Sequence, residues 1–274
     1  MTRRQIEERL RTAGIENAAG EAKLLFCHFS GMSPAAAMAE PHADCADPAL
    51  AGAVARRTAR EPLAYILGEA WFYNEHYRVS PACLIPREET ELLVDYAVDH
   101  LPPNALFADF CTGSGCIAIS TLCSRADVTA HAFDLSPAAL ALARENAQES
   151  GVADRVTFFE ADLLKEGGVC CEDRYDMIIS NPPYLTDADL AAPQPEITHE
   201  PRMALAGGAD GLTFYRHFLT HYRHLLAPGG LFLFEIGAAQ GADILALGGS
   251  LGYAATVQRD LAGLDRMAIL IPNI

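Results

Sequence analysis

Hydrophobic residues recur at helical spacing through about the first 60 residues of the chain. Ser33-Pro34 and Asp47-Pro48 each place an N-cap side chain directly before a proline, which is typical of a helix start. Residues 48–60, rich in alanine and arginine, predict a helix that stops near Pro62. We therefore expect a small helical N-terminal domain over residues 1–75. The residues that share helical faces are Ile6, Leu10 and Ala13, followed by Ala22, Leu25, Phe26 and Phe29.

A short aromatic segment separates this domain from the rest of the chain. Residues 69–81 read EAWFYNEHYRVSP, which predicts two short strands around Asn74-Glu75. Such a hairpin suits a connection between two domains. We therefore place the boundary near 75–87, with a hairpin or linker over 76–87 and a second domain over 88–274.

From about residue 104 the pattern changes to strands that alternate with helices. Near-continuous apolar strands joined by helices indicate a mostly parallel sheet that is covered on both faces. Too few residues separate the last two strands for a helix, so one of them is expected to run antiparallel. The predicted fold class is α/β, with a seven-stranded, mostly parallel, Rossmann-like sheet behind the helical domain. The predicted strands are 105–110, 128–133, 155–160, 175–180, 231–236, 253–258 and 267–272, and the predicted helices are 115–124, 137–150, 212–226 and 238–247.

Charge and composition narrow the classes of function. The chain has 274 residues, half of them hydrophobic, and a net charge of −16. Residues 1–80 have a net charge of −1 and residues 81–274 one of −15. Stable binding to a nucleic-acid backbone needs clustered Lys and Arg, so this acidity argues against it.

Location is also constrained by the sequence. No apolar run is long enough to span a membrane, and the N-terminus lacks the apolar core of a signal peptide. The eight cysteines include no C-x-x-C pair, so we expect reduced thiols in a cytoplasmic protein, with Cys170 and Cys171 in a loop. The cysteines are residues 27, 45, 83, 111, 116, 123, 170 and 171.

Three predicted strands end in residues suited to an adenosine. The first is followed by the small-residue loop Cys111-Thr112-Gly113-Ser114-Gly115, whose backbone N–H groups can approach a ligand closely. The second ends in Asp134, whose carboxylate can accept both hydroxyls of a ribose. The third is followed by Asp162 and Leu163, where an acidic group can accept the amino group of an adenine. The loop does not read G-x-G-x-x-G, so no pyrophosphate is required.

The fourth strand ends in Asn181-Pro182-Pro183-Tyr184. Two prolines make this turn rigid and remove two N–H donors, so nearby carbonyls remain free as acceptors. The Asn181 side-chain oxygen and the Pro182 carbonyl can each accept one hydrogen of a planar NH₂ group, and Tyr184 can stack on the group that carries it. The alternative is an ordinary proline turn after a strand.

These motifs resemble those of the class I S-adenosylmethionine-dependent methyltransferases that act on amide or exocyclic amino nitrogens. More closely, the chain resembles the release-factor glutamine methyltransferases, which methylate the glutamine of the Gly-Gly-Gln motif in peptide chain release factors. The resemblance runs from about residue 60 to the C-terminus. Its supporting segments are AYILG at 64–68, LIPREETELLVDYA at 84–97, EPRMALAGGADGLTFY at 200–215, APGGLFLFEIGAAQG at 227–241 and RDLAGLDRMA at 259–268.

The resemblance implies a site, a cofactor and a partner. The cofactor would be S-adenosylmethionine, the partner a release factor, and the helical domain a substrate-binding domain; no metal is expected, and the protein is expected to be a monomer. Asn181, Pro182 and Tyr184 would be catalytic, and residues 181–184 would grip the substrate glutamine. Cys111 and Glu88 depart from the family, which more often has glycine and proline there. The implied cofactor-binding residues are Cys111, Thr112, Gly113, Ser114, Gly115, Asp134, Asp162, Leu163 and Asn181.

Other interpretations stay open at this point. An N6-adenine nucleic-acid methyltransferase would use the same turn, but it would need a basic surface to hold the strand whose base it flips. A methyltransferase for a ribosomal-protein glutamine and a non-catalytic cofactor-binding scaffold are further alternatives. His217, His221 and His224 fit one helical face, where zinc binding is the less favoured interpretation. Arg56, Arg57 and Arg60 are expected to form a solvated helix face or, alternatively, to contact RNA.

Overall fold

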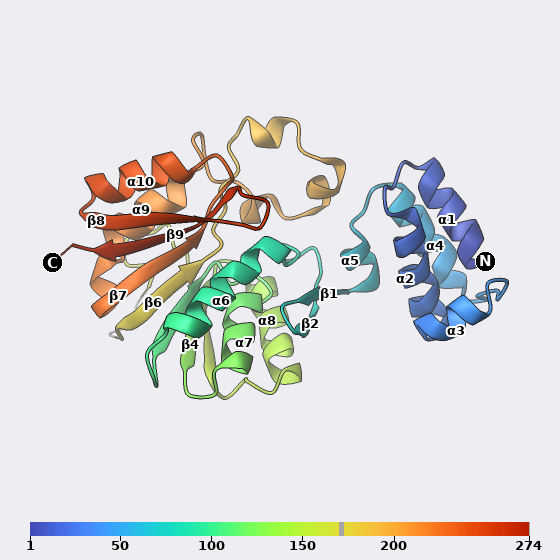
Figure 1. The fold of residues 1–274 in the computed structure, drawn as a ribbon, viewed down its shortest axis with the longest axis horizontal. Coiled ribbons are helices and arrows are strands. Elements are labelled where there is room, and N and C mark those ends of the chain that lie inside the picture. Colours follow the sequence, from blue (N-terminus) through green and yellow to red (C-terminus); the bar gives the residue numbers. More distant parts are fainter. Residues whose placement is uncertain (170–172, 274) are drawn as a thin grey trace. The chain divides into compact units, whose positions relative to one another are not determined.

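The computed structural model describes residues 1–169 and 173–273, so the expected loop cysteines Cys170 and Cys171 lie outside the described residues. The chain forms two compact units (Figure 1). The first comprises Met1–Glu69 and Gln194–His199, and the second comprises Ala70–Pro193 and Glu200–Ile274. The division falls earlier than the expected 75–87, because Phe72 and Tyr77 of the hairpin pack into the core of the second unit.

The first unit is helical, and its helices begin where the sequence predicts. Ser33 accepts a hydrogen bond from the Ala36 N–H, and Asp47 accepts one from the Ala49 N–H, so both predicted N-caps are confirmed. Ile6 and Leu10 are fully buried in its core, whereas Ala13 is the half-buried C-cap of the first helix. The helices are α1 (Arg3–Thr12), α2 (Ala18–Ser30), α3 (Pro34–Ala39), α4 (Pro48–Thr58) and α5 (Leu63–Leu67).

Arg57, expected on a solvated face, is instead buried within the first unit. Its guanidinium pairs with Glu21 at 2.6 Å and with Glu196 at 3.2 Å. Arg60 also pairs with Glu196, at 3.1 Å. Arg56 does lie at the surface, where it pairs with Glu61. The two carboxylates compensate the burial of Arg57, a compensation that spacing along the helix alone cannot indicate.

The second unit contains the predicted seven-stranded sheet. Its strand order is β5-β4-β3-β6-β7-β9-β8, and β9 runs antiparallel to both of its neighbours, as the short final connection predicts. A separate two-stranded hairpin precedes it, as expected from residues 69–81. The strands are β1 (Glu69–Phe72), β2 (Glu75–Arg78), β3 (Leu106–Phe110), β4 (Thr129–Asp134), β5 (Val156–Glu160), β6 (Tyr175–Ser180), β7 (Leu226–Glu235), β8 (Tyr253–Arg259) and β9 (Asp265–Pro272).

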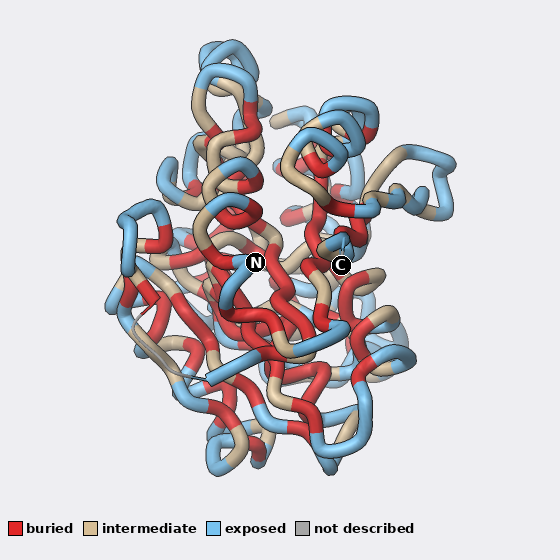
Figure 2. The backbone as a smooth tube through the Cα atoms, turned by 90° about the vertical axis from the view of Figure 1, so that its left-hand side faces the viewer, coloured by how far each residue is buried: buried red, intermediate tan, exposed pale blue. Residues whose placement is uncertain are grey.

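Helices cover both faces of the sheet (Figure 1). Alternate strand residues supply the two cores: Phe107 packs into one, while Ala108 and Phe110 pack into the other. The first core includes side chains of α6, α7 and α8, and the second includes side chains of α9 and α10. Buried residues therefore lie mainly in the strands and on the inner sides of the helices, and exposed residues lie mainly in the outer turns (Figure 2). The helices are α6 (Glu91–His100), α7 (Cys116–Ser124), α8 (Pro137–Glu149), α9 (Thr213–His221) and α10 (Gly241–Ser250).

Two regions differ from the predicted elements. α6 was not predicted, and the helix predicted over 212–226 ends at His221, after which β7 starts five residues earlier than expected. None of the helices in the described ranges is both long and apolar enough to cross a bilayer. Single 3₁₀ turns complete the chain: η1 (Glu88–Thr90), η2 (Asp189–Ala191), η3 (Pro195–His199), η4 (Arg202–Ala204) and η5 (Arg223–Leu225).

Candidate active site

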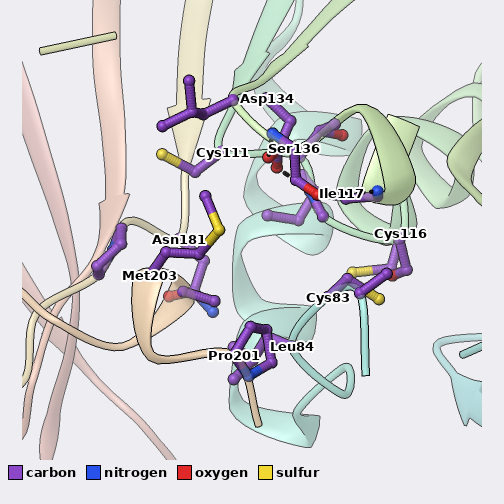
Figure 3. A pocket seen from close by; sticks show the side chains of 18 of the residues that line it. Cys83, Leu84, Cys111, Cys116, Ile117, Asp134, Ser136, Asn181, Pro201 and Met203 are labelled. Atoms are coloured by element: carbon purple, nitrogen blue, oxygen red, sulfur yellow. Dashed lines mark hydrogen bonds between the residues drawn. The ribbon is translucent and has the colours of Figure 1, made fainter. Parts of the chain in front are cut away.

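A cavity in the second unit lies where the central parallel strands end (Figure 3). Strand register creates this convergence: Phe110 of β3 is paired with Phe133 of β4 and with Ser180 of β6. All three strands therefore end at the same side of the sheet, and the segments that follow them converge there. The predicted residues that line the cavity are Cys111, Thr112, Gly113, Ser114, Asp134, Asp162, Leu163, Asn181 and Pro183. Three predicted residues, Gly115, Pro182 and Tyr184, are not among the lining residues.

The small-residue loop after β3 has a conformation that favours glycine. Gly113 and Gly115 have φ values of 56° and 83°, both in the left-handed region. A Cβ added at Gly115 would lie 2.8 Å from Ile119 Cδ1 and 3.2 Å from the Ala143 Cβ. Gly115 thus lies behind the loop, where it allows α7 and α8 to pack closely.

Cys111 is in the left-handed region as well, with a φ of 61°. A side chain there is strained by about 1–2 kcal/mol, because its Cβ approaches the backbone. The family's preference for glycine at this position therefore has a conformational reason. Burial raises the pKa of the Cys111 thiol well above its usual range, so the thiol is protonated at neutral pH. The six described cysteines are free thiols.

Asp134 connects the end of β4 to the small-residue loop. Its carboxylate accepts hydrogen bonds from the Gly113 N–H at 2.8 Å and from the Ser136 N–H at 2.9 Å. Burial raises the pKa of Asp134, while these backbone donors oppose the rise. The carboxylate is therefore fixed at the cavity wall by donors from both sides.

Asp162 and Leu163 form part of the wall beyond β5. Asp162 accepts a hydrogen bond from the Leu164 N–H and pairs with Lys165 at 3.3 Å. The buried side chain of Leu163 is anchored from behind, because the Tyr222 hydroxyl donates to the Leu163 carbonyl at 3.1 Å. The turn is thus held in place, with an apolar and an acidic side chain on the cavity.

Asp109, near the end of β3, holds the small-residue loop from inside the protein and is not among the predicted site residues. Its Oδ2 accepts hydrogen bonds from the Thr112 hydroxyl at 2.6 Å and from the Ala118 N–H at 3.2 Å. Complete burial raises its pKa to about 7. Its Oδ1 is buried with no hydrogen-bond partner in the described part of the chain.

The turn after β6 contacts a polar network whose central residues, Thr90 and Glu235, are buried. The Asn181 Nδ2 donates to the Thr90 hydroxyl at 3.1 Å, and that hydroxyl donates to Glu235 at 2.5 Å. The Tyr184 hydroxyl lies 3.4 Å from the other Glu235 oxygen. Thr90 and Glu235 belong to none of the strand-end motifs, although both lie in segments that carry the family resemblance.

One expectation about the peripheral residues needs revision. His224 lies in η5 rather than on the helix that carries His217 and His221, so the three imidazoles do not share one helical face. Within the described ranges there is no group of three residues that could hold a metal ion. Glu88 is exposed at the start of η1 and outside the cavity lining, where an acidic side chain suits a helix N-terminus. Neighbouring Arg87 lines the cavity and pairs with the buried Glu200.

The sheet order, the glycine-containing loop, the acidic strand ends and the Asn-Pro-Pro-Tyr turn together define a class I S-adenosylmethionine-dependent methyltransferase. Comparison with known proteins agrees. Residues 2–68 match the PrmC N-terminal domain, and residues 88–211 match the Methyltransferase small domain. A solved methyltransferase from Pyrococcus furiosus shares the fold at a TM-score of 0.54 and 17% identity, covering 72% of this chain and 89% of that one.

Relatives with known names narrow the class to one family. The release factor glutamine methyltransferase of Nitratidesulfovibrio vulgaris is 37% identical, over 99% of this chain and 94% of its own. That of Cereibacter sphaeroides is 40% identical, over 94% of this chain and 93% of its own. The chain belongs to the release factor glutamine methyltransferase family and is an enzyme whose methyl donor is S-adenosylmethionine.

The cavity has the chemistry that this methyl donor requires. Backbone with positive φ at Gly113 brings the chain close to the ligand space, and the Asp134 carboxylate lies at the strand end beside it. Leu135, Leu163 and Phe214 supply apolar wall. A closely approaching backbone, the carboxylates of Asp134 and Asp162 and apolar side chains in one cavity suit an adenosine with a charged amino-acid tail.

Proposed function

We propose that this enzyme transfers a methyl group from S-adenosylmethionine to the side-chain amide nitrogen (N5) of the glutamine in the Gly-Gly-Gln motif of class I peptide chain release factors. One observation carries the proposal: Asn181 projects from a rigid proline turn into the same cavity as the small-residue loop. Family membership supports the substrate, since the relatives bear that activity in their names.

The family resemblance and the lining of the cavity support the cofactor-binding roles. Residues 111–115 and Asp134 would hold the cofactor, with Asp134 toward the ribose, and Asp162 and Leu163 would lie at the adenine. Gly115 would act indirectly, by letting the loop close on α7 and α8. Bound S-adenosylmethionine supplies an electrophilic sulfonium methyl group.

The turn would orient the glutamine for in-line attack. The Asn181 side-chain oxygen and the Pro182 carbonyl would each accept one hydrogen of the glutamine NH₂, and Pro183 and Tyr184 would confine the side chain. An amide nitrogen is a poor nucleophile, because its lone pair is delocalised. Acceptors on both hydrogens draw electron density onto nitrogen and stabilise the positive charge that develops in the transition state.

The setting of this activity follows from its substrate. Release factors act in translation termination, so we propose that the enzyme works in the cytoplasm. We also propose a monomer as the functional form.

Methyl transfer from labelled S-adenosylmethionine tests this function directly. The acceptors are a release factor, its Gly-Gly-Gln→Gly-Gly-Ala variant, a ribosomal protein and DNA. Label is expected on the wild-type release factor alone. Label on DNA or on the ribosomal protein, or equal label on the variant, would sink the proposal.

Replacing the key acceptor tests its role. Asn181→Ala is expected to lower kcat by about 10²–10³-fold, because one aligned hydrogen bond to the transition state is lost. Asn273→Ala is the matched control, since Asn273 is exposed and outside the cavity lining. Similar kcat values for the two variants would remove Asn181 from the chemistry.

A further inference from the structure

A hydrogen-bonded chain of three polar side chains includes the first residue of the Asn-Pro-Pro-Tyr turn: Asn181 is half-buried, and Thr90 and Glu235 are buried. It runs from the Asn181 amide to the Thr90 hydroxyl and on to the Glu235 carboxylate. Thr90 is 2% exposed and Glu235 is 1% exposed. Asn181 directly follows β6, Thr90 lies in η1 and Glu235 ends β7, so the tertiary fold brings the three residues together.

The number of hydrogens that each group can donate fixes the direction of both hydrogen bonds between these three side chains. A threonine hydroxyl has one hydrogen to donate. An ionised Glu235 can only accept, so it takes that hydrogen over the 2.5 Å contact. Thr90 can then only accept from Asn181, and the Asn181 group that faces it must be the NH₂. The amide oxygen of Asn181 therefore takes no part in these hydrogen bonds and faces away from Thr90.

We propose that Thr90 and Glu235 are positioning residues that hold the Asn181 amide with its oxygen toward the substrate nitrogen. This inference rests on the proposed function, because it assigns an orientation to the residue that would grip the glutamine. A flipped Asn181 would present its NH₂ to the glutamine NH₂. Two donors facing each other form no hydrogen bond, so the flip would remove the acceptor on which the chemistry depends.

The charges around Glu235 make the orientation depend on pH. Burial raises the pKa of Glu235 to about 7, while the Thr90 hydrogen bond and the Arg266 charge oppose the rise. Glu89 raises the pKa further, and the Tyr184 hydroxyl lowers it. Above pH 7 the carboxylate is ionised and accepts from Thr90. Below pH 7 it carries a proton of its own to donate, and the fixed direction is lost.

Isosteric variants of Thr90 separate the hydroxyl from packing. Thr90→Val removes the hydroxyl, and Thr90→Ser keeps it. The matched control is Thr121→Val, because Thr121 is also buried but donates only to the Ile117 carbonyl within α7. Measurements are kcat for release-factor methylation from pH 5.5 to 9 and the Kd for S-adenosylmethionine.

We expect Thr90→Val to lower kcat by about 10–100-fold at pH 8, the range found for hydrogen-bond partners that orient metal-ligating side chains. Thr90→Ser should stay within about threefold of wild type, with the Kd for S-adenosylmethionine unchanged in both. Wild-type kcat should fall below pH 7, and this fall should be absent in Thr90→Val and in Glu235→Gln. Equal kcat in Thr90→Val and Thr121→Val, or a fall below pH 7 that persists in Glu235→Gln, would overturn the inference.

A readout without substrate keeps this inference separate from the proposed function. The side-chain NH₂ resonance of Asn181, identified by its loss in Asn181→Asp, should shift with pH near 7 in wild type and not in Thr90→Val. A shift in wild type alone supports the inference even if wild type fails to methylate a release factor, which would overturn only the proposed function. A resonance that does not respond to pH in wild type would overturn the inference.

Discussion

The backbone conformation at Cys111 explains what the replacement of the family's usual glycine changes at this position. Its φ of 61° places a side chain where glycine is preferred, at the start of the small-residue loop. The departure therefore acts on the stability of the loop and leaves the polar groups of the cavity unchanged. This residue allows a direct measurement of the strain.

We expect Cys111→Gly to be more stable than Cys111→Ala by about 1 kcal/mol. Both variants lose the thiol, so their difference isolates the Cβ in the left-handed region. Urea unfolding of the two variants measures the difference in unfolding free energy. Equal stabilities would mean that the backbone relaxes to remove the strain.

Gly115 combines the same backbone requirement with close packing. Gly115→Ala is expected to lower the unfolding free energy by about 2–4 kcal/mol and to weaken binding of S-adenosylmethionine, because a Cβ would meet Ile119 and Ala143. Gly151→Ala is the control: its φ is 70°, but no atom lies within 4 Å of the added Cβ. It should cost only about 1 kcal/mol and leave binding unchanged. Calorimetry of unfolding and of cofactor binding provides both quantities, and equal effects at the two sites would contradict the packing argument.

At the scale of elements, strand register determines which residues meet. Phe110, Phe133 and Ser180 are paired across β3, β4 and β6, so the segments that follow them converge on one cavity. The Ser180 hydroxyl strengthens this edge by donating to the Phe110 carbonyl at 2.6 Å. A parallel sheet thus assembles a site from residues about 70 positions apart without a dedicated binding loop for each.

The helical unit has a comparable long-range element in residues 194–199. Arg57 is buried between Glu21 and Glu196, and the hydrogen bonds raise its pKa although burial opposes them. Glu196 therefore attaches this short segment to α4 of the same unit. The interaction closes a loop of more than 130 residues in sequence.

Adjacent arginines test this attachment. Arg57→Ala is expected to lower the unfolding free energy by about 3 kcal/mol, because two carboxylates lose their buried partner. Arg56→Ala should cost under about 1 kcal/mol, since Arg56 forms a surface pair with Glu61. Thermal and urea unfolding of both variants decide the matter. Equal losses would show that Arg57 contributes no more than a surface ion pair.

At the scale of the whole molecule, charge is distributed unevenly. Residues 1–80 carry a net charge of −1, and residues 81–274 carry −15. Acidity on this scale attracts a basic partner surface and is screened by salt. A protein substrate with a basic surface therefore fits this chain better than a nucleic acid.

Raising salt from about 50 to 300 mM is expected to increase the KM for a release factor about three- to tenfold. The value of kcat should stay constant, because the buried groups at the site are screened little by salt. Steady-state kinetics at several salt concentrations measure both. A constant KM would assign the charge to solubility alone.

Much of the architecture is predictable from local pattern. Alternating apolar strands and helices predicted the seven strands and the single antiparallel one, and Ser33 and Asp47 marked their helix starts correctly. Nine of the predicted site residues line one cavity, because parallel strands end at one edge of the sheet. The failures are also physical: α6 begins at Glu91, in a stretch for which the pattern predicted no element, and the helix before β7 ends at His221.

The sequence by itself determined the order of elements, the class of the site and the residues at each strand end, since these depend on neighbours along the chain. Only the tertiary structure decided which distant groups meet. Thr90 reaches Asn181 across 91 positions and Glu235 across 145, and Arg57 reaches Glu196 across 139. No periodicity encodes such pairs, because their partners are chosen by packing and by the need to satisfy buried polar groups.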